Sequence, residues 1–164
     1  MLLMTEQQPE GRFNLKDPVH VLACGFGLGL AKKAPGTWGT LAAFPFYFVL
    51  LQFPDWVYLL ATMVMAVVGI WICGKTSEDM GVHDHGGIVW DEVVGMLITL
   101  FWVPVEWPWI LAAFVAFRFF DILKPWPIRW LDKQVDGGFG IMIDDVIAGL
   151  FGLAVMHLAL YYWY

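Results

Sequence analysis

Long apolar runs separated by short polar connections dominate the chain. Four of them approach the roughly 20 residues that a helix needs to cross a bilayer, namely 56–74, 88–105, 107–123 and 146–164. A fifth run, 38–54, is shorter and carries Pro45 near its start, which favours a kinked or tilted helix. The run 19–31 is too short to span, and its alternating glycines favour a re-entrant or interfacial element. The pattern predicts an all-α, polytopic membrane protein with about five spanning helices.

The composition agrees with this fold class. Hydrophobic residues make up 60% of the 164 residues and charged residues 15%, with a mean hydropathy of +0.68. A soluble domain of this size needs more charge to cover its surface. Cys24 and Cys73 lack the spacing of a disulfide framework or a thiolate metal site. We expect a polar cytoplasmic tail over residues 1–18 and one membrane-embedded domain over 19–164.

Basic residues gather in one set of connections, at Lys32, Lys33, Lys75, Lys124, Arg129 and Lys133. The opposite connections, near Asp55 and Glu106, contain no Lys or Arg. By the positive-inside bias, the N-terminus and both longer loops are expected in the cytoplasm and the C-terminus outside.

Two pairs of adjacent carboxylates lie at the cytoplasmic ends of predicted spans. Asp91 and Glu92 open one span, and Asp144 and Asp145 precede another. Plain helix capping is one explanation, because a helix N-terminus favours nearby negative charge.

The glycines that follow the acids favour a metal site instead. Asp91 and Asp145 are each followed four residues later by a glycine, Gly95 and Gly149, which lies on the same helix face. Two helices that meet on such smooth faces would bring the two aspartates together. Like charges held close need a shared proton or a cation, and carboxylate oxygens suit Mg²⁺. Adjacent helix positions point about 100° apart, so the neighbouring acids need not share this ion.

Polar residues at the same depth are candidates for phosphate binding. Thr37 follows the Pro35-Gly36 turn at a predicted helix start, where N–H groups and hydroxyls seat anions, although an ordinary cap is the alternative. His85, in the loop GVHDHGG with His83, is a possible acid, base or metal ligand, or only a hydrogen-bonding residue.

The stretch 117–133 adds a basic loop to the acidic ends of the spans. Lys124 and Arg129 neutralise phosphate charge in one interpretation and only fix the topology in the other. Arg118 and Asp121, three residues apart in the apolar run, form a self-neutralising pair.

One stretch imitates a nucleotide-binding motif. GIWICGKT, residues 69–76, fits G-x-x-x-x-G-K-[ST], but it ends a predicted spanning helix and does not link a strand to a helix. We expect neither a nucleotide nor a nucleic acid as a partner.

Four longer motifs occur in the order PGTWGT, GVHDHGGIVWDEVVGM, FRFFDILKPWPIRWLD and GGFGIMIDDVIAG. Together they closely resemble the bacterial phosphatidylglycerophosphatase A family, from about residue 20 to the C-terminal end. The resemblance implies a Mg²⁺-dependent enzyme of the inner membrane, which hydrolyses phosphatidylglycerophosphate to phosphatidylglycerol and phosphate in phospholipid biosynthesis.

The resemblance and the residue patterns together give the expected site. The resemblance implies acidic catalytic positions at Asp91, Glu92, Asp144 and Asp145. The metal ligands are then expected at Asp91, Glu92 and Asp145, and the substrate contacts at Thr37, His85, Lys124 and Arg129. The alternative function is a small cation transporter or channel that uses the same acids as an ion path. Transporters place such acids near the bilayer midplane, whereas these cluster at one face. Oligomeric state, metal count and the choice between direct water attack and a phospho-enzyme stay open.

Overall fold

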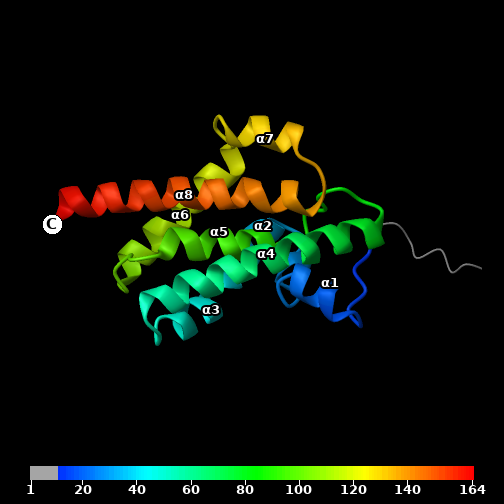
Figure 1. Ribbon diagram of the computed structural model, residues 1–164, viewed down its shortest axis with the longest axis horizontal. Helices are drawn as coiled ribbons and strands as arrows, with labels where there is room; N and C mark the ends of the chain where they lie inside the picture. The colour runs from blue at the N-terminus through cyan, green and yellow to red at the C-terminus, as the bar shows by residue number, and fades with distance from the viewer. Residues whose placement is uncertain (1–10) are drawn as a thin grey trace, which may run out of the picture.

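A computed structural model describes residues 11–164, and this part of the chain is all-helical (Figure 1). The helices are α1 (Pro18–Ala23), η1 (Leu28–Leu30), α2 (Pro35–Leu41), α3 (Ala43–Leu50), α4 (Asp55–Met80), α5 (Trp90–Leu100), α6 (Trp107–Leu123), α7 (Ile128–Gln134) and α8 (Gly137–Trp163). The all-α prediction is confirmed for this part, and residues 1–10 of the expected tail lie outside it.

Two helices of the described chain are long and apolar enough to cross a membrane. They are α4, with 26 residues, and α8, with 27, each about 40 Å long at 1.5 Å per residue. Both cover runs predicted to span. The helix α6 has 17 residues, and the run 38–54 is divided at Ala42 into the end of α2 and α3. Five spans therefore stay a prediction.

Two expected helix boundaries were wrong. The run 88–105 does not form one helix, because α5 has only 11 residues and ends at Leu100. The chain then turns at Trp102, which has a φ of 59°, and Pro104 cannot continue a helix. Asp144 and Asp145 do not precede their helix, since α8 already begins at Gly137.

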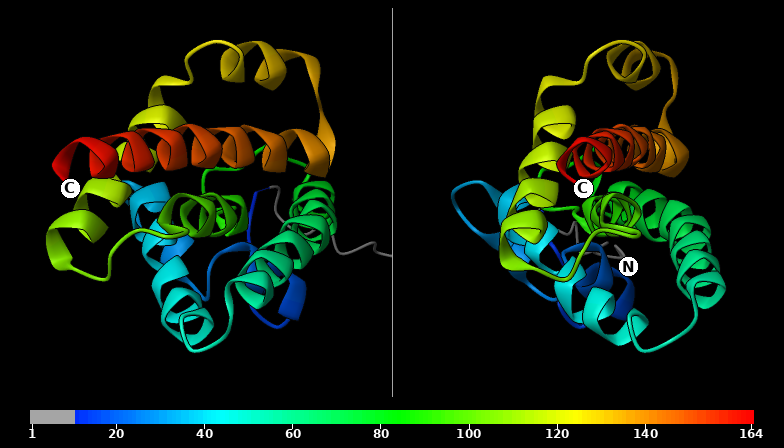
Figure 2. Two further views of the ribbon diagram at one scale, coloured as in Figure 1. Left: turned by 60° about the vertical axis from the view of Figure 1, so that its left-hand side comes forward. Right: turned by 90° about the vertical axis from the view of Figure 1, so that its left-hand side faces the viewer.

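The helix α8 runs along the whole molecule and packs against α4, α5, α6 and α7 (Figures 1 and 2). The short helix α5 lies between its neighbours, and Val93, Val94, Met96 and Leu97 on it are fully buried. Thr99 and Tyr58 secure α5, because their hydroxyls donate to the carbonyls of Gly149 at 3.2 Å and of Leu97 at 2.6 Å. This buried, hydrogen-bonded helix carries Asp91 and Glu92 in its first turn.

Backbone contact between α5 and α8 confirms the predicted smooth faces. A Cβ atom on Gly149 would lie 2.6 Å from the carbonyl oxygen of Gly95. A Cβ atom on Gly95 would lie 2.7 Å from the carbonyl oxygen of Asp145. Real side chains essentially never approach backbone this closely, so only glycine allows this approach.

The N-terminal element 19–31 does not span, as predicted. It consists of the six-residue α1, a turn with positive φ at Gly25, Phe26 and Gly27, and the three-residue η1. The amide of Val89 donates to the carbonyl of Ala23 at 2.7 Å. This contact ties the element to the residue that precedes α5 and so supports the start of the acidic helix.

The glycine contact predicts a clear effect on stability. Gly149→Ala adds one methyl group against the Gly95 carbonyl, and we expect it to lower the unfolding free energy by about 1–3 kcal/mol, as overpacking does. Thermal unfolding in detergent measures this. The control is Gly86→Ala, because a Cβ atom at Gly86 meets its nearest neighbour, Pro35, at 3.9 Å. Equal stability of the two variants would contradict the close backbone contact.

Candidate active site

Carboxylates from three helices converge at one end of the bundle. The start of α5 contributes Glu92, the end of α6 contributes Asp121, and the first part of α8 contributes Asp145. One ligand oxygen from each lies within 4.8 Å of the others. Asp91 is buried, and its carboxyl group is a neighbour of that of Asp145. The predicted meeting of Asp91 and Asp145 is therefore present, and we call these four residues the acidic cluster.

Arg118 is the cation that contacts the acidic cluster in the described part of the chain. Its Nη1 donates to Asp121 on the same helix and to Glu92 Oε1 at 3.4 Å. The predicted Arg118–Asp121 pair is thus present and also reaches across to α5. A single guanidinium facing four carboxyl groups leaves excess negative charge, which requires a further cation or shared protons.

The donor set of the acidic cluster fits a hard divalent cation. Asp91 Oδ1 and Glu92 Oε2 are buried and have no hydrogen-bond partner among the described residues. A buried oxygen without a partner costs free energy, and a bound cation removes that cost. All the available ligands are carboxylate oxygens, which suit Mg²⁺ better than zinc. The cluster is therefore compatible with a metal-dependent phosphatase.

Asp144 belongs to a second group of charges beside the acidic cluster. Lys124, directly after α6, donates from Nζ to Asp144 Oδ2 at 3.2 Å and to Asp132 Oδ1 at 3.1 Å. Partial burial alone would lower the pKa of Lys124, but hydrogen bonds and charges from both carboxylates raise it overall. Lys124 therefore stays protonated and links the segment after α6 to α7 and α8. Asp144 therefore contacts other partners than Asp145, and its predicted catalytic role stays a prediction.

Thr37 lies close to the acidic cluster. A Cβ atom on the preceding residue, Gly36, would lie 2.6 Å from Glu92 Oε1 and 3.0 Å from the Arg118 guanidinium. Thr37 and Arg118 line the same pocket of about 400 Å³. The start of α2 thus closes one side of the site, although Thr37 does not cap this helix through its side chain.

His85 and Arg129 have contacts away from the acidic cluster. His85 Nδ1 accepts from the Gly87 amide at 3.0 Å, and the ring packs edge-on against Phe13. The exposed Arg129 donates from Nη2 to the Leu123 carbonyl at 3.2 Å and lines a pocket of about 440 Å³ with Lys124. That His85 and Arg129 contact the substrate stays a prediction.

Asp121 was missed as a ligand candidate. Its spacing from Arg118 indicated only a neutralised pair, and α6 lacks the Asp-x-x-x-Gly pattern of α5 and α8. Its position among the other acids depends on the packing of α6 against α5 and α8, which no local pattern records.

A second group of possible metal ligands, Asp17, His20 and Asp79, joins α1 to α4. His20 is buried and uses both ring nitrogens, since Nδ1 accepts from the Asn14 amide at 3.0 Å and Nε2 lies 3.2 Å from Asp79 Oδ2. A ring with both nitrogens engaged is a structural link. The motif GIWICGKT also has no functional geometry, because it lies inside the continuous helix α4 and forms no loop.

The fold and the acidic cluster define a class of protein. It is helical and has two helices suited to a membrane, and its carboxylate site is compatible with metal-dependent phosphatase chemistry. Comparison with known proteins then gives the family: the family model PgpA, phosphatidylglycerophosphatase A, matches residues 21–160. The chain belongs to this family and is a phosphatase, which confirms the resemblance seen in the motifs and does not favour the transporter alternative.

Individual relatives match over nearly the whole chain. Phosphatidylglycerophosphatase A of Escherichia coli K12 is 47% identical over 155 residues, which cover 94% of this chain and 90% of the relative. The protein of that name from Haemophilus influenzae Rd is 51% identical over 162 residues, covering 98% and 99%. A putative phosphatidylinositol-3-phosphatase of Bacteroides thetaiotaomicron is 37% identical over 147 residues, covering 85% and 91%. No solved structure matches.

The Lys124–Asp144 contact predicts energetic coupling. Lys124→Met leaves Asp144, whose side chain is 6% exposed, without its counter-charge. We expect a loss of about 2 kcal/mol in unfolding free energy, less than for a fully buried pair because Lys124 reaches solvent. In an Asp144→Asn background the same change should cost less than about 1 kcal/mol. Chemical unfolding in micelles measures all four proteins, with the exposed Lys133→Met as control. Additive losses would contradict the coupling.

Proposed function

We propose that the chain hydrolyses phosphatidylglycerophosphate to phosphatidylglycerol and phosphate, in phospholipid biosynthesis, with Mg²⁺ bound by Glu92, Asp121 and Asp145. The observation that carries the proposal is the meeting of three carboxylates from three helices within 4.8 Å, next to a guanidinium. The names of the two most similar relatives described above support the substrate. Asp91, which was also expected to bind metal, adjoins Asp145 and completes the carboxylate shell.

A divalent cation held by Glu92, Asp121 and Asp145 would supply charge neutralisation for the phosphate and activation of the attacking water. The protein's own residues do the rest. Arg118 Nε is buried and has no partner among the described residues, so it has a donor available for a phosphate oxygen. Arg118 and Thr37 line one pocket, and we assign the phosphate to this place. The ion pairs of Arg118 with Glu92 and Asp121 fix the orientation of the guanidinium before substrate binds.

Asp91 is positioned to move a proton. Its Oδ1 is buried and has no partner among the described residues, and the neighbouring carboxyl group of Asp145 limits the space around it. We assign to Asp91 Oδ1 the acceptance of a proton from the attacking water. As the bond from phosphorus to the glycerol oxygen breaks, Asp91 returns this proton to that oxygen, so that phosphatidylglycerol leaves as the alcohol. Asp144 acts differently: through Lys124 it holds the basic segment after α6 against the site. Lys124 therefore positions Arg129 and the rest of that segment around the lipid head group.

The site is proposed to face the cytoplasm from the inner membrane. The acids lie near the ends of α5 and α6 and in the first third of α8, on the side of the basic connections. Such connections are retained in the cytoplasm. The long apolar helices α4 and α8 would anchor the protein in the bilayer.

The proposed chemistry predicts the behaviour of one residue that the sequence patterns did not single out. Purified protein should release phosphate from phosphatidylglycerophosphate only with Mg²⁺, and faster than from phosphatidylinositol 3-phosphate. Asp121→Asn should lower kcat/KM by a factor on the order of 10² to 10³, the scale of one electrostatic contact in a transition state. Mg²⁺ should also raise the unfolding temperature of the wild type and not of the variant, because only a bound ion stabilises the folded state.

The matched control for Asp121→Asn is Asp136→Asn, whose carboxylate is 92% exposed. It should keep both the activity and the Mg²⁺-dependent stabilisation. Full activity of Asp121→Asn would remove this residue from the site, and Mg²⁺-independent hydrolysis by the wild type would overturn the metal proposal.

The orientation is tested by labelling single cysteines. We expect His83→Cys and Gln134→Cys, both at exposed positions, to react with an impermeant maleimide only in inverted membrane vesicles. Tyr164→Cys should react only in intact spheroplasts. The native Cys24 and Cys73 are buried and give little background. Labelling of residue 83 or 134 in intact spheroplasts would contradict the cytoplasmic location.

A further inference from the structure

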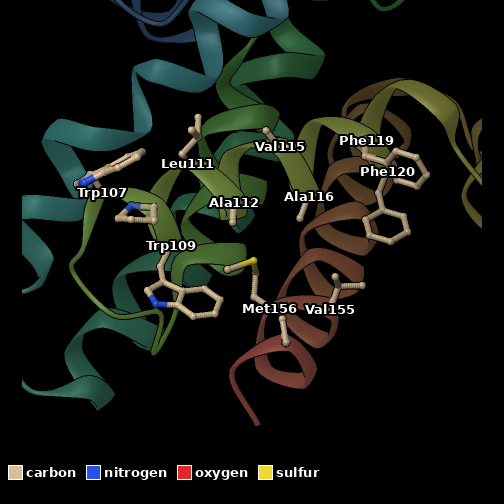
Figure 3. Close-up of a pocket in the computed structure, with 12 residues that line it drawn as sticks. Trp107, Trp109, Leu111, Ala112, Val115, Ala116, Phe119, Phe120, Val155 and Met156 are labelled. Atoms are coloured by element: carbon tan, nitrogen blue, oxygen red, sulfur yellow. The ribbon is translucent and has the colours of Figure 1, made fainter. Parts of the chain in front are cut away.

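An apolar groove runs between α6 and α8 on the outside of the bundle (Figure 3). Its volume is about 700 Å³, and every residue that lines it is apolar. Ala112 and Ala116, one turn apart on α6, leave the space that larger side chains would fill, and Met156 lies across from them on α8 (Figure 3). We call this the α6–α8 groove.

The groove leads to the proposed phosphate position. The pocket that contains Thr37 and Arg118 shares two lining residues, Val115 and Phe119, with the α6–α8 groove. Arg118 in turn contacts Glu92 of the acidic cluster. The pocket that contains Thr37 and Arg118 and the apolar groove are therefore neighbours along one helix face.

The length of the groove matches one lipid chain. From Trp107 at one end to Arg118 beyond the other is 11 residues of α6, or about 16 Å at 1.5 Å per residue. This is about half of the 30 Å hydrocarbon thickness of a bilayer, which is the length that one extended acyl chain covers.

We propose that the α6–α8 groove holds one acyl chain of the substrate lipid while its phosphate lies at Arg118. This inference rests on the proposed function, since it specifies the lipid part of the same substrate. The occupant is a substrate chain because the groove opens into the pocket of Arg118, and only a molecule with both a phosphate and a long apolar chain fills both. A helix of a second copy on this face would cover the Arg118 pocket and obstruct the phosphate.

Comparison of long-chain and short-chain substrates tests the groove separately from the chemistry. Ala116→Phe fills the groove, and Ala154→Phe places the same side chain at an exposed position of α8 outside it. For the long-chain lipid, Ala116→Phe should lower kcat/KM about tenfold or more, because a displaced chain misplaces the phosphate. For an analogue with the same head group and acetyl chains, kcat/KM should stay within about twofold of the wild type. Ala154→Phe should resemble the wild type with both substrates.

Other outcomes would overturn the proposal. If Ala116→Phe lost kcat/KM equally with both substrates, the groove would only support the fold of the site. If its long-chain activity were unchanged, the groove would not hold the substrate chain. An Ala154→Phe loss as large as that of Ala116→Phe would make the effect nonspecific. Failure of the wild type to hydrolyse either substrate would instead refute the proposed function and is distinguishable in the same assay.

A second measurement needs no variant. Wild-type enzyme is irradiated with a substrate analogue that carries a photoreactive group on the acyl chain, and the adducts are located by mass spectrometry. We expect adducts on Val115, Val155 and Met156, which line the groove. Adducts confined to the exposed face of α4, at Val64 and Val67, or a dimer cross-linked through the groove, would overturn the assignment.

Discussion

The contact between the backbones of α5 and α8 at Gly95 and Gly149 is the constraint on which the site depends. A Cβ atom added to Gly149 would lie 2.6 Å from the carbonyl oxygen of Gly95, so the contact leaves no room for any side chain. The carboxylates one turn earlier on each helix are then brought together whatever their mutual repulsion. The close packing of α5 against α8 therefore holds the two carboxylates together, although they would separate in a more loosely packed structure. The Thr99 hydroxyl lies within hydrogen-bonding distance of the carbonyls of both glycines and so fixes the register of the pair.

Electrostatics explains the remaining arrangement. The acidic cluster carries more negative charge than Arg118 can neutralise, and two of its buried oxygens are unpaired among the described residues. Excess negative charge in the free site attracts a cation, and the bound cation in turn neutralises the anionic ester. Asp144 is separated from it, because Lys124 engages Asp144 together with Asp132. Two adjacent aspartates on α8 therefore have different neighbours, because Asp145 lies in the acidic cluster and Asp144 contacts Lys124.

Features that follow from residue spacing within one helix were predicted from the sequence. Features that depend on the packing of one helix against another were missed. The Asp-x-x-x-Gly pattern correctly predicted the α5–α8 contact, because helical periodicity alone places acid and glycine on one face. Asp121 was missed because its role requires α6 to lie across both helices, and no spacing in the sequence reports that crossing. Helix length was also misjudged: residues 101–105 are as apolar as the helix before them, yet Pro104 and the turn at Trp102 end α5 early. Apolar side chains alone do not distinguish a spanning helix from an apolar turn that follows one.

The central claim is that the glycine contact, by aligning the acids, creates the cation site. The most direct measurement is the affinity of Gly149→Ala for Mn²⁺, a paramagnetic substitute for Mg²⁺, by electron paramagnetic resonance in micelles. All the carboxylates are present in this variant, so any change in affinity reports their spacing. The account predicts that the dissociation constant of Mn²⁺ is at least tenfold larger for Gly149→Ala than for the wild type and for Gly86→Ala. An unchanged affinity in a folded Gly149→Ala protein would contradict it.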